Sequence, residues 1–193
     1  MDQSILTVWR SAVAIYMYHH LPDKEAADED LKRLGFPATS MGLHRALSGN
    51  ACCIRNVFYY RSHRAFPYLT KISKLFLRPM FGLEIDVSDG IGGGMQIFHG
   101  YSTIVFARSI GKNFTVYQNV AVGRGKTREQ SDIPMIGDNV IIFTGAVVIG
   151  GVKIGDNVRI GAGAVVTKDV PSGATVVGAK MRILSEDGMQ VKK

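Results

Sequence analysis

Residues 136–170 read IGDNVIIFTGAVVIGGVKIGDNVRIGAGAVVTKDV and repeat with a period of six. Every sixth residue is aliphatic, and the residue four places after it is small or branched. The aliphatic series is Ile136, Ile142, Val148, Ile154, Ile160 and Val166, and the second series is Val140, Ala146, Val152, Val158, Ala164 and Val170. Neither an α-helix nor a simple amphipathic strand has this period, so the repeat decides the fold of this half of the chain.

A period of six is explained by stacked coils of about eighteen residues, each made of three short strands joined by tight bends. The aliphatic residue points into the prism, and the small residue lies near a corner, where a large side chain would crowd the turn. The turn residues Gly137-Asp138-Asn139 and Gly155-Asp156-Asn157 tolerate left-handed backbone. We therefore expect a mainly β protein built on a parallel β-helix of hexapeptide repeats.

The repeat extends upstream with two irregularities. The matching aliphatic residues are Ile85, Ile91 and Ile97, then Ile104 after a one-residue irregularity, then Ile110, Val116 and Val122. The 26 residues from Ile110 to Ile136 are not a multiple of six. We expect the charged stretch 124–134 to leave the coil as a loop, and such loops often carry function.

The first 80 residues predict an α-helical domain. The spacing of apolar residues and the charge pattern predict helices at 5–17, 23–34, 54–64 and 68–77. Gly35, Pro37, Gly42 and Gly49 interrupt the pattern between the second and third helices. We divide the chain into a helical domain at 1–80, a β-helix at 81–184 and a tail at 185–193.

Composition limits the location and the redox state. The apolar stretch 11–18 is too short to span a bilayer, and Asp2 spoils the basic start of a secretory signal. We therefore expect a cytoplasmic protein. The only cysteines, Cys52 and Cys53, are adjacent, so we expect reduced structural thiols and no metal site.

The positive charge is concentrated before the β-helix. No Asp or Glu occurs from Leu31 to Leu83, whereas the basic residues are Lys32, Arg33, Arg45, Arg55, Arg61, Arg64, Lys71, Lys74 and Arg78. An anionic substrate, an anionic membrane or a solvated basic face explains this segment. Nucleic-acid binding has no motif behind it and is not expected. A peripheral contact with the inner face of the membrane is a hypothesis that rests on Arg55, Phe58, Tyr59, Tyr60, Arg61 and Arg64.

Two stretches carry a family resemblance. They are IGGGMQIFHGYSTIVFARSIGKNFTVYQNVAVGRG at 91–125 and MIGDNVIIFTGAVVIGGVKIGDNVRIGAGAVVTKDVPSGATVVGAKMRI at 135–183. Residues 80–184 resemble the serine acetyltransferase branch of the left-handed β-helix acyltransferases, and more closely the O-acetyltransferases of capsule and colanic-acid polysaccharide synthesis. The resemblance implies a left-handed coil, acetyl-CoA as donor, a hydroxyl acceptor and a homotrimer with active sites between prisms. A dimer of trimers is the alternative assembly.

Acetyl transfer to an alcohol needs a base for the hydroxyl proton, and a neutral imidazole suits that task. The resemblance places this base at His99 and its orienting carboxylate at Glu84, fifteen residues earlier. It places the donor groove at Thr144, Ala162, Thr167, Lys168 and Arg182. Lys168 and Arg182 would contact the phosphates, although Lys168 could also be a solvated turn lysine and His99 a histidine of the prism surface.

Two departures from the serine enzymes bear on the acceptor. Phe98 replaces an aspartate, and Asp132-Ile133-Pro134 replaces an Arg-His-Pro motif. The Asp132 carboxylate would repel that of an amino acid, whereas Phe98 and Tyr101 suit the apolar face of a sugar ring. We therefore expect a sugar or polysaccharide precursor as acceptor, with L-serine as the alternative small molecule. Phe98 packing at a subunit interface also stays open.

Two alternatives belong to other classes of protein. One is an inert trimeric scaffold, and the other is a carbonic-anhydrase-like metal protein. Only His99 among the histidines lies beyond residue 63, which leaves no histidine cluster for a metal in the β-helix. The Glu84 and His99 pair together with Thr167 and Lys168 favours an enzyme over a scaffold.

Overall fold

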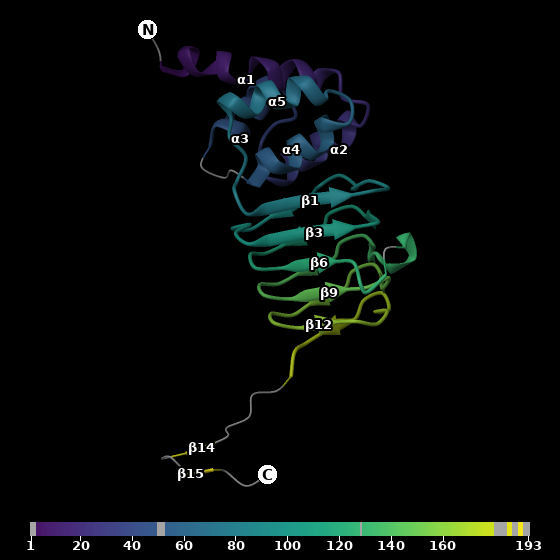
Figure 1. The fold of residues 1–193 in the computed structure, drawn as a ribbon. Coiled ribbons are helices and arrows are strands. Elements are labelled where there is room, and N and C mark those ends of the chain that lie inside the picture. The colour runs from purple at the N-terminus through teal and green to yellow at the C-terminus, as the bar shows by residue number, and fades with distance from the viewer. Residues whose placement is uncertain (1–2, 50–52, 128, 180–184, 187–188, 191–193) are drawn as a thin grey trace.

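The protein consists of a helical layer on top of a β-helix (Figure 1). The computed structural model describes residues 3–49, 53–127, 129–179, 185–186 and 189–190. The helices in this part of the chain are α1 (Gln3–His19), α2 (Lys24–Arg33), α3 (Ser40–Ser48), α4 (Cys53–His63) and α5 (Pro67–Phe76). The four predicted helices are confirmed, and none of the described helices is long and apolar enough to cross a membrane.

Helix α3 lies where the sequence analysis expected only an interruption, and that expectation was wrong. Thr39 caps the helix, because its Oγ1 accepts a hydrogen bond from the Gly42 N–H at 3.1 Å. Gly42 is required inside the helix, since a Cβ there would lie 1.8 Å from the carbonyl oxygen of Pro37. The glycine therefore marks a close backbone approach and not a break.

Three parallel sheets form the faces of the prism. The first face contains β1 (Leu83–Val87), β3 (Thr103–Ala107), β6 (Ala121–Gly123), β9 (Val147–Ile149) and β12 (Val165–Val166). The second contains β4 (Ser109–Ile110), β7 (Met135–Ile136) and β10 (Lys153–Ile154). The third contains β2 (Gln96–Ile97), β5 (Thr115–Val116), β8 (Ile141–Ile142), β11 (Arg159–Ile160) and β13 (Thr175–Val176). These sheets confirm the predicted β-helix.

Two further strands follow the prism. They are β14 (Ser185–Glu186) and β15 (Met189–Gln190), and they pair antiparallel. Residues 180–184 lie outside the described part of the chain, so the predicted domain boundary at 184 stays a prediction.

The core of the prism is a stack of aliphatic side chains in register. On the first face, Val105, Val122, Val148 and Val166 align, and each is at most 4% exposed. Full burial of such a side chain stabilises the fold by about 1.5–3 kcal/mol. Ile104, which the repeat analysis placed in this series, is instead 47% exposed on the outer surface. That assignment was wrong because the corner at 98–102 is longer than the corners below it.

A ladder of asparagines stabilises one edge of the prism. Asn113, Asn139 and Asn157 all adopt left-handed backbone, with φ between 56° and 58°. The Asn113 Nδ2 donates to the Asn139 Oδ1 at 3.0 Å, and the Asn139 Nδ2 donates to the Asn157 Oδ1 at 3.2 Å. The predicted role of these turn residues is confirmed, and each coil fixes the next.

A buried ion pair joins the helical layer to the first coil. The Arg61 Nε lies 2.6 Å from the Asp30 Oδ2, and each side chain is 3% exposed. Arg61 also donates to the carbonyls of Ile91 at 3.0 Å and Gly92 at 2.8 Å, while Asp30 accepts from the Met95 N–H at 2.7 Å. Burial raises the pKa of the Asp30 carboxyl, and Arg61 and the Met95 N–H oppose that rise. These contacts clamp the glycine-rich segment 91–95.

Other members of the basic segment are also internal. Arg33 donates to the carbonyl of Gly94 and, at 2.6 Å, to the Thr115 Oγ1. Arg55 donates to the carbonyls of Leu47, Gly49 and Arg78. Phe58 and Tyr59 are each 3% exposed. The cluster on which the membrane hypothesis rested is therefore largely buried, which gives that hypothesis no support from these residues, and it stays a prediction.

Candidate functional site

His99 lies in the corner at 98–102, between β2 on the third face and β3 on the first. Its backbone is left-handed, with φ 64°, which costs a residue other than glycine free energy and is often found at functional positions. The strands β2, β5, β8 and β11 pair in register, so the same corner position in the next three coils belongs to Gln118, Thr144 and Ala162. We call this column the His99 edge.

The left-handed turn recurs down this edge. The position after the His99 column is occupied by Gly100, Asn119, Gly145 and Gly163, with φ of 57°, 58°, 70° and 65°. The corner at 98–102 is nevertheless distinct, because Ile97 to Val105 spans eight residues whereas the paired Val116 to Val122 spans six. The two additional residues give His99 and Tyr101 room outside the regular coil, where both are exposed.

Aromatic rings stack beside the His99 edge. The ring centroids of Phe98 and Tyr117 are 4.9 Å apart, and those of Tyr117 and Phe143 are 5.3 Å apart, with nearly parallel planes. Phe98 is 36% exposed and Tyr101 is 62% exposed. The two residues predicted to contact the acceptor therefore lie in the same corner as the predicted base, at the accessible end of an aromatic stack.

Gln118, directly below His99, was missed by the sequence analysis. Its Oε1 is buried, and it is the one buried side-chain oxygen or nitrogen without a hydrogen-bond partner among the described residues. Its carbonyl accepts from the Thr144 Oγ1 at 3.0 Å, and the Thr144 carbonyl accepts from the Gly163 N–H at 3.0 Å. Only the register of the coils reveals that this acceptor lies in the column of His99, Thr144 and Ala162.

The remaining predicted donor residues lie on another edge. Thr167 and Lys168 are exposed directly after β12, where the first face turns into the second. The loop at 124–134 leaves the same edge after β6 (Figure 1). Arg182 lies outside the described residues. One chain therefore brings Thr144 and Ala162 to the His99 edge but does not bring Thr167 and Lys168 there.

Asp132 organises this loop. Its carboxylate accepts from the Thr127 N–H at 2.6 Å, and its carbonyl accepts from the Gly125 N–H at 3.0 Å. The single helical turn Gln130–Asp132 packs directly on the next coil, since a Cβ on Gly151 would lie 1.7 Å from the Ser131 carbonyl oxygen. The predicted contact of Asp132 with an acceptor stays a prediction, and the observed contacts are internal to the loop.

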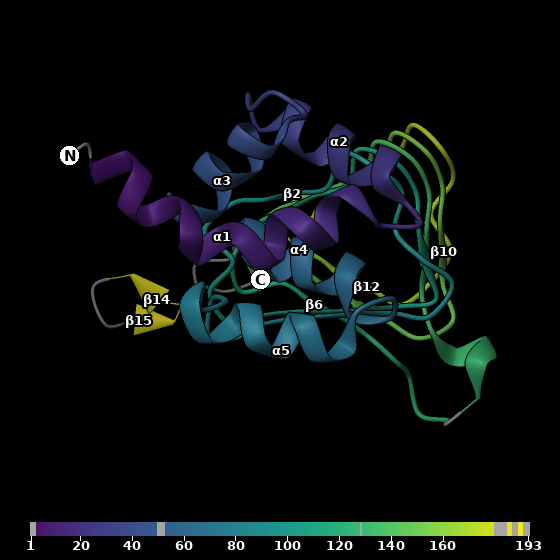
Figure 2. The same ribbon diagram turned by 90° about the horizontal axis from the view of Figure 1, so that it is seen from above.

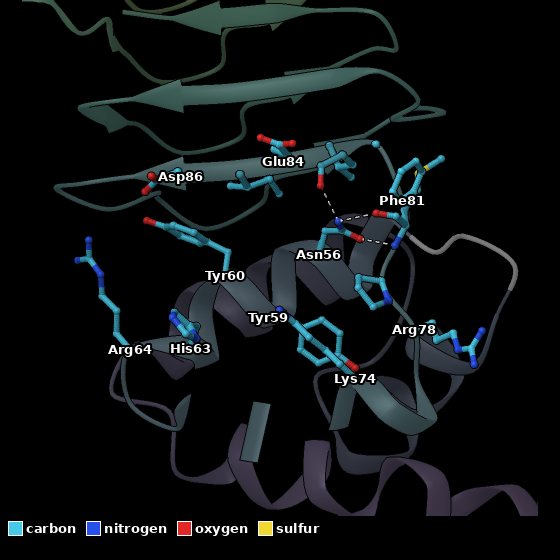
Figure 3. A pocket seen from close by; sticks show the side chains of 15 residues that line it. Asn56, Tyr59, Tyr60, His63, Arg64, Lys74, Arg78, Phe81, Glu84 and Asp86 are labelled. Carbon is cyan, nitrogen blue, oxygen red and sulfur yellow. Dashed lines mark hydrogen bonds between the residues drawn. The ribbon is translucent and has the colours of Figure 1, made fainter. Parts of the chain in front are cut away.

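Glu84 is exposed on β1, where its Cα pairs with that of Ile104. No hydrogen bond or ion pair joins its carboxylate to His99, although both residues lie in the described part of the chain. Instead, Glu84 lines a pocket of about 890 Å³ between β1 and the helices α4 and α5 (Figure 3). The predicted pairing of the two residues stays a prediction.

The pocket combines charge of both signs with aromatic rings. Figure 3 shows Glu84 and Asp86 on β1, and Tyr60 and His63 of α4 with Arg64 directly after that helix on the other side of the pocket. Lys74, Arg78 and Phe81 line its other end. A Cβ on Gly100 would lie 3.1 Å from the Met80 Sδ and 3.2 Å from the Leu83 Cδ2, and both residues line the pocket. The corner that carries His99 thus packs against the wall of this pocket.

The described residues contain no cluster of potential metal ligands. No group of three or more His, Cys, Asp or Glu side chains that could hold a metal ion occurs within residues 3–49, 53–127 and 129–179 or the short strands that follow. Within the corner at 98–102, His99 is the one basic side chain.

Comparison with known proteins agrees with this geometry. Residues 134–168 match the family model described as bacterial transferase hexapeptide (six repeats). The serine acetyltransferase of Staphylococcus aureus strain Mu50 is 38% identical over 157 residues, which cover 80% of this chain and 70% of the relative. The chain belongs to the hexapeptide-repeat transferase family. Its similarity to serine acetyltransferases shows that it is an acyltransferase of the O-acetyltransferase type.

Solved structures extend the likeness to the helical layer. The soybean serine acetyltransferase apoenzyme is 25% identical to this hexapeptide-repeat transferase, with a TM-score of 0.62. The match covers 82% of the transferase and 67% of the soybean chain. Isoform 3 from Entamoeba histolytica, solved with cysteine, is 23% identical with a TM-score of 0.59 and supports the fold alone. That match covers 94% of the transferase described here and 65% of the Entamoeba chain. All three relatives are named serine acetyltransferases, so they support that branch of the resemblance and not the polysaccharide branch.

Proposed function

We propose that this chain transfers the acetyl group of acetyl-CoA to the hydroxyl of L-serine. The observation that carries the proposal is the placement of His99 in a left-handed corner, in register with Gln118, Thr144 and Ala162. The serine acetyltransferase from Staphylococcus aureus, 38% identical to this chain, supports both donor and acceptor. This acceptor was the alternative of the sequence analysis, and the relatives favour it over the sugar that the sequence analysis preferred.

In the proposed reaction, the imidazole of His99 removes the hydroxyl proton as the oxygen attacks the thioester carbonyl. The new C–O bond forms, the C–S bond breaks, and the CoA sulfur leaves with the proton that the imidazole held. Glu84 would orient that imidazole from the neighbouring strand. Hydrogen bonds of this kind are often long before substrate binds, so their absence from the unliganded chain is compatible with the role.

Acetyl-CoA would lie along the His99 edge. The Gln118 Oε1 is a buried acceptor without a hydrogen-bond donor, and an amide N–H of the pantetheine arm could donate to it. Thr144 and Ala162 continue the same column. The phosphates need cations, for which we propose Lys168 and Arg182.

The placement of donor residues on two edges supports a homotrimer. A neighbouring prism could bring its Lys168 to the His99 edge of this chain, which a single chain does not do. The first face, between the two edges, also exposes apolar side chains outward, with Ile104 47%, Ile149 42% and Val165 66% exposed. Burial of such a surface stabilises association.

The acceptor pocket has to compensate for the missing Arg-His-Pro motif. The Asp132 carboxylate is turned onto the Thr127 N–H, which removes part of its repulsion toward an amino acid. Positive charge is instead available beside Glu84, from Lys74 and Arg78 in the 890 Å³ pocket. These side chains could hold the carboxylate of L-serine.

A sugar hydroxyl is the second candidate acceptor, and the Phe98, Tyr117 and Phe143 stack favours it. The apolar face of a pyranose ring packs well on such rings, and the accessible Phe98 is adjacent to His99. The side chains of the corner therefore fit both L-serine and a sugar as acceptor, and the test must include both.

The deciding experiment measures thiol release from acetyl-CoA with L-serine, free sugars and nucleotide-linked or lipid-linked sugars as separate acceptors. We expect turnover with L-serine and little with the sugars. Turnover with a sugar alone would move the function to the second candidate. Absence of turnover with every acceptor, together with no CoA binding in calorimetry, would show an inert scaffold and overturn the proposal.

The loop at 124–134 provides a separate prediction. Gly151→Ala should push the turn Gln130–Asp132 off the coil, because its Cβ would lie 1.7 Å from the Ser131 carbonyl oxygen. We expect kcat/KM to fall about 10–100-fold, since a displacement near 1 Å can have an effect of this size. Gly123→Ala is the matched control, because its Cβ would meet nothing within 4 Å. Equal activity of the two variants would show that the loop takes no part in the reaction.

A further inference from the structure

Helix α5 has its apolar side outward. Its buried residues are Thr70 and Ser73, each 0% exposed. The Thr70 Oγ1 lies 3.1 Å from the Ser62 Oγ, and the Ser73 Oγ lies 3.2 Å from the Tyr59 hydroxyl. A helix on the surface of a globular protein normally buries its apolar face and exposes its polar one. The reversed pattern in α5 indicates an apolar environment on its outer side.

The outward residues of α5 form one stripe. Tyr68 is 77% exposed, Ile72 42%, Leu75 73% and Phe76 44%. Ile72 follows Tyr68 by four residues, and Leu75 and Phe76 follow Ile72 by three and four, so each lies next to Ile72 on the helix surface. Trp9 of α1 continues the stripe, because it is 55% exposed and its ring lies 5.2 Å from that of Phe76. We call Trp9, Tyr68, Ile72, Leu75 and Phe76 the α1–α5 face.

This face lies at the end of the molecule that is farthest from the coils. Figure 1 shows α1 and α5 above α2 and α4, with the prism below them. Figure 2, seen from above, shows α1 and α5 side by side over the prism. Helices α1 and α5 therefore form the outer layer of the helical region, on the side opposite the prism.

The charge around the face is of one sign. Arg10, Lys71, Lys74 and Arg78 flank it, whereas the sequences of α1 and α5 contain no Asp or Glu. A contact between two copies related by a twofold axis would place these cations against their own counterparts. An anionic surface would instead pair with them. The charge thus favours an anionic partner over a second copy of the chain.

We propose that the α1–α5 face docks on an anionic lipid bilayer. Tyr68 and Trp9 would lie at the level of the headgroups, Leu75 and Ile72 would enter the acyl boundary, and Lys71 would contact lipid phosphates. The prism would then project from the bilayer with its edges accessible. This surface differs from the cluster around Arg55 and Phe58 that the sequence analysis chose, and it does not depend on the identity of the acceptor.

Co-sedimentation of the full chain with vesicles tests the proposal. We expect binding to phosphatidylcholine vesicles that contain phosphatidylglycerol, weak binding to pure phosphatidylcholine, and loss of binding at high salt. The double variant Tyr68→Ser/Leu75→Ser should bind at least about tenfold more weakly. Lys71→Gln should bind about fivefold more weakly, as expected for the loss of one charge near the surface.

Val177→Ser is the matched control, because Val177 is also 73% exposed but lies after β13 on the prism. It should bind vesicles like the unaltered chain. Absence of binding to anionic vesicles would overturn the proposal. So would a change in assembly size of the Tyr68→Ser/Leu75→Ser variant in light scattering without a change in vesicle binding, because the face would then be a contact between copies.

Discussion

Replacing His99 with asparagine is expected to lower kcat/KM for acetyl transfer by about 10²–10⁴-fold, the usual contribution of a general base. Asparagine removes the imidazole but tolerates left-handed backbone, as Asn119 shows with φ 58° in the coil below. The free energy of unfolding should therefore change little. Steady-state kinetics with saturating acetyl-CoA measures the first quantity, and urea unfolding measures the second.

Two controls separate the base from its backbone. His99→Ala also removes the imidazole, so it should lose the same activity. Because alanine disfavours left-handed backbone, such as the φ of 64° at this position, the variant should lose about 1 kcal/mol of stability as well. His20→Asn makes the same chemical change directly after α1, where the His20 Nδ1 contacts the Tyr16 carbonyl oxygen, and should keep full activity. Activity of His99→Asn near that of His20→Asn would contradict the assignment of the base.

The β-helix was predictable because its determinants are local and repeated. Each coil carries its own aliphatic residue and turn asparagine, so the period from Ile136 onward already contains the register. Ile104 was misplaced because the corner at 98–102 has two additional residues, and no local pattern tells which neighbour of a long corner returns to the core. The structure buries Val105 instead, at 0% exposure.

Parts of the site depended on information that lies beyond local sequence. The family resemblance, not the repeat, identified His99 and Glu84. Gln118 becomes visible only when β5 is set in register with β2 and β8. The pocket beside Glu84 could not be predicted, because α4 and α5 supply five of its fifteen lining residues from positions 10 to 28 residues before Glu84.

The basic segment illustrates a different limit. Its charge was attributed to an anionic partner or to a solvated basic face, yet Arg33, Arg55 and Arg61 are bound to backbone carbonyls or to Asp30. A guanidinium that binds carbonyls leaves no charge pattern in the sequence, since its partners are peptide groups of any residue. The cations around α5 instead lie over aromatic rings: Arg10 over Trp9, Lys71 over Tyr68 and Lys74 over Tyr59.

Replacing Arg61 with alanine is expected to destabilise the fold by about 3–5 kcal/mol, the typical effect of breaking a buried ion pair. The variant leaves the Asp30 carboxylate buried at 3% exposure and leaves the carbonyls of Ile91 and Gly92 without their donor. Arg108→Ala is the matched control. Its ion pair with Asp89 is about half exposed, so it should contribute no more than about 1 kcal/mol. Urea unfolding of the two variants measures the difference.

The paired variant Arg61→Met/Asp30→Leu distinguishes the ion pair from the clamp that it forms. Removing both charges should recover part of the stability lost in Arg61→Ala, because no uncompensated charge stays buried. It should not recover activity, since the segment 91–95 leads directly into β2 and the corner of His99, and its carbonyls and the Met95 N–H would stay unpaired. Full activity in the paired variant would show that the first coil holds His99 in place without the helical layer. Low activity with recovered stability would show that the clamp positions His99.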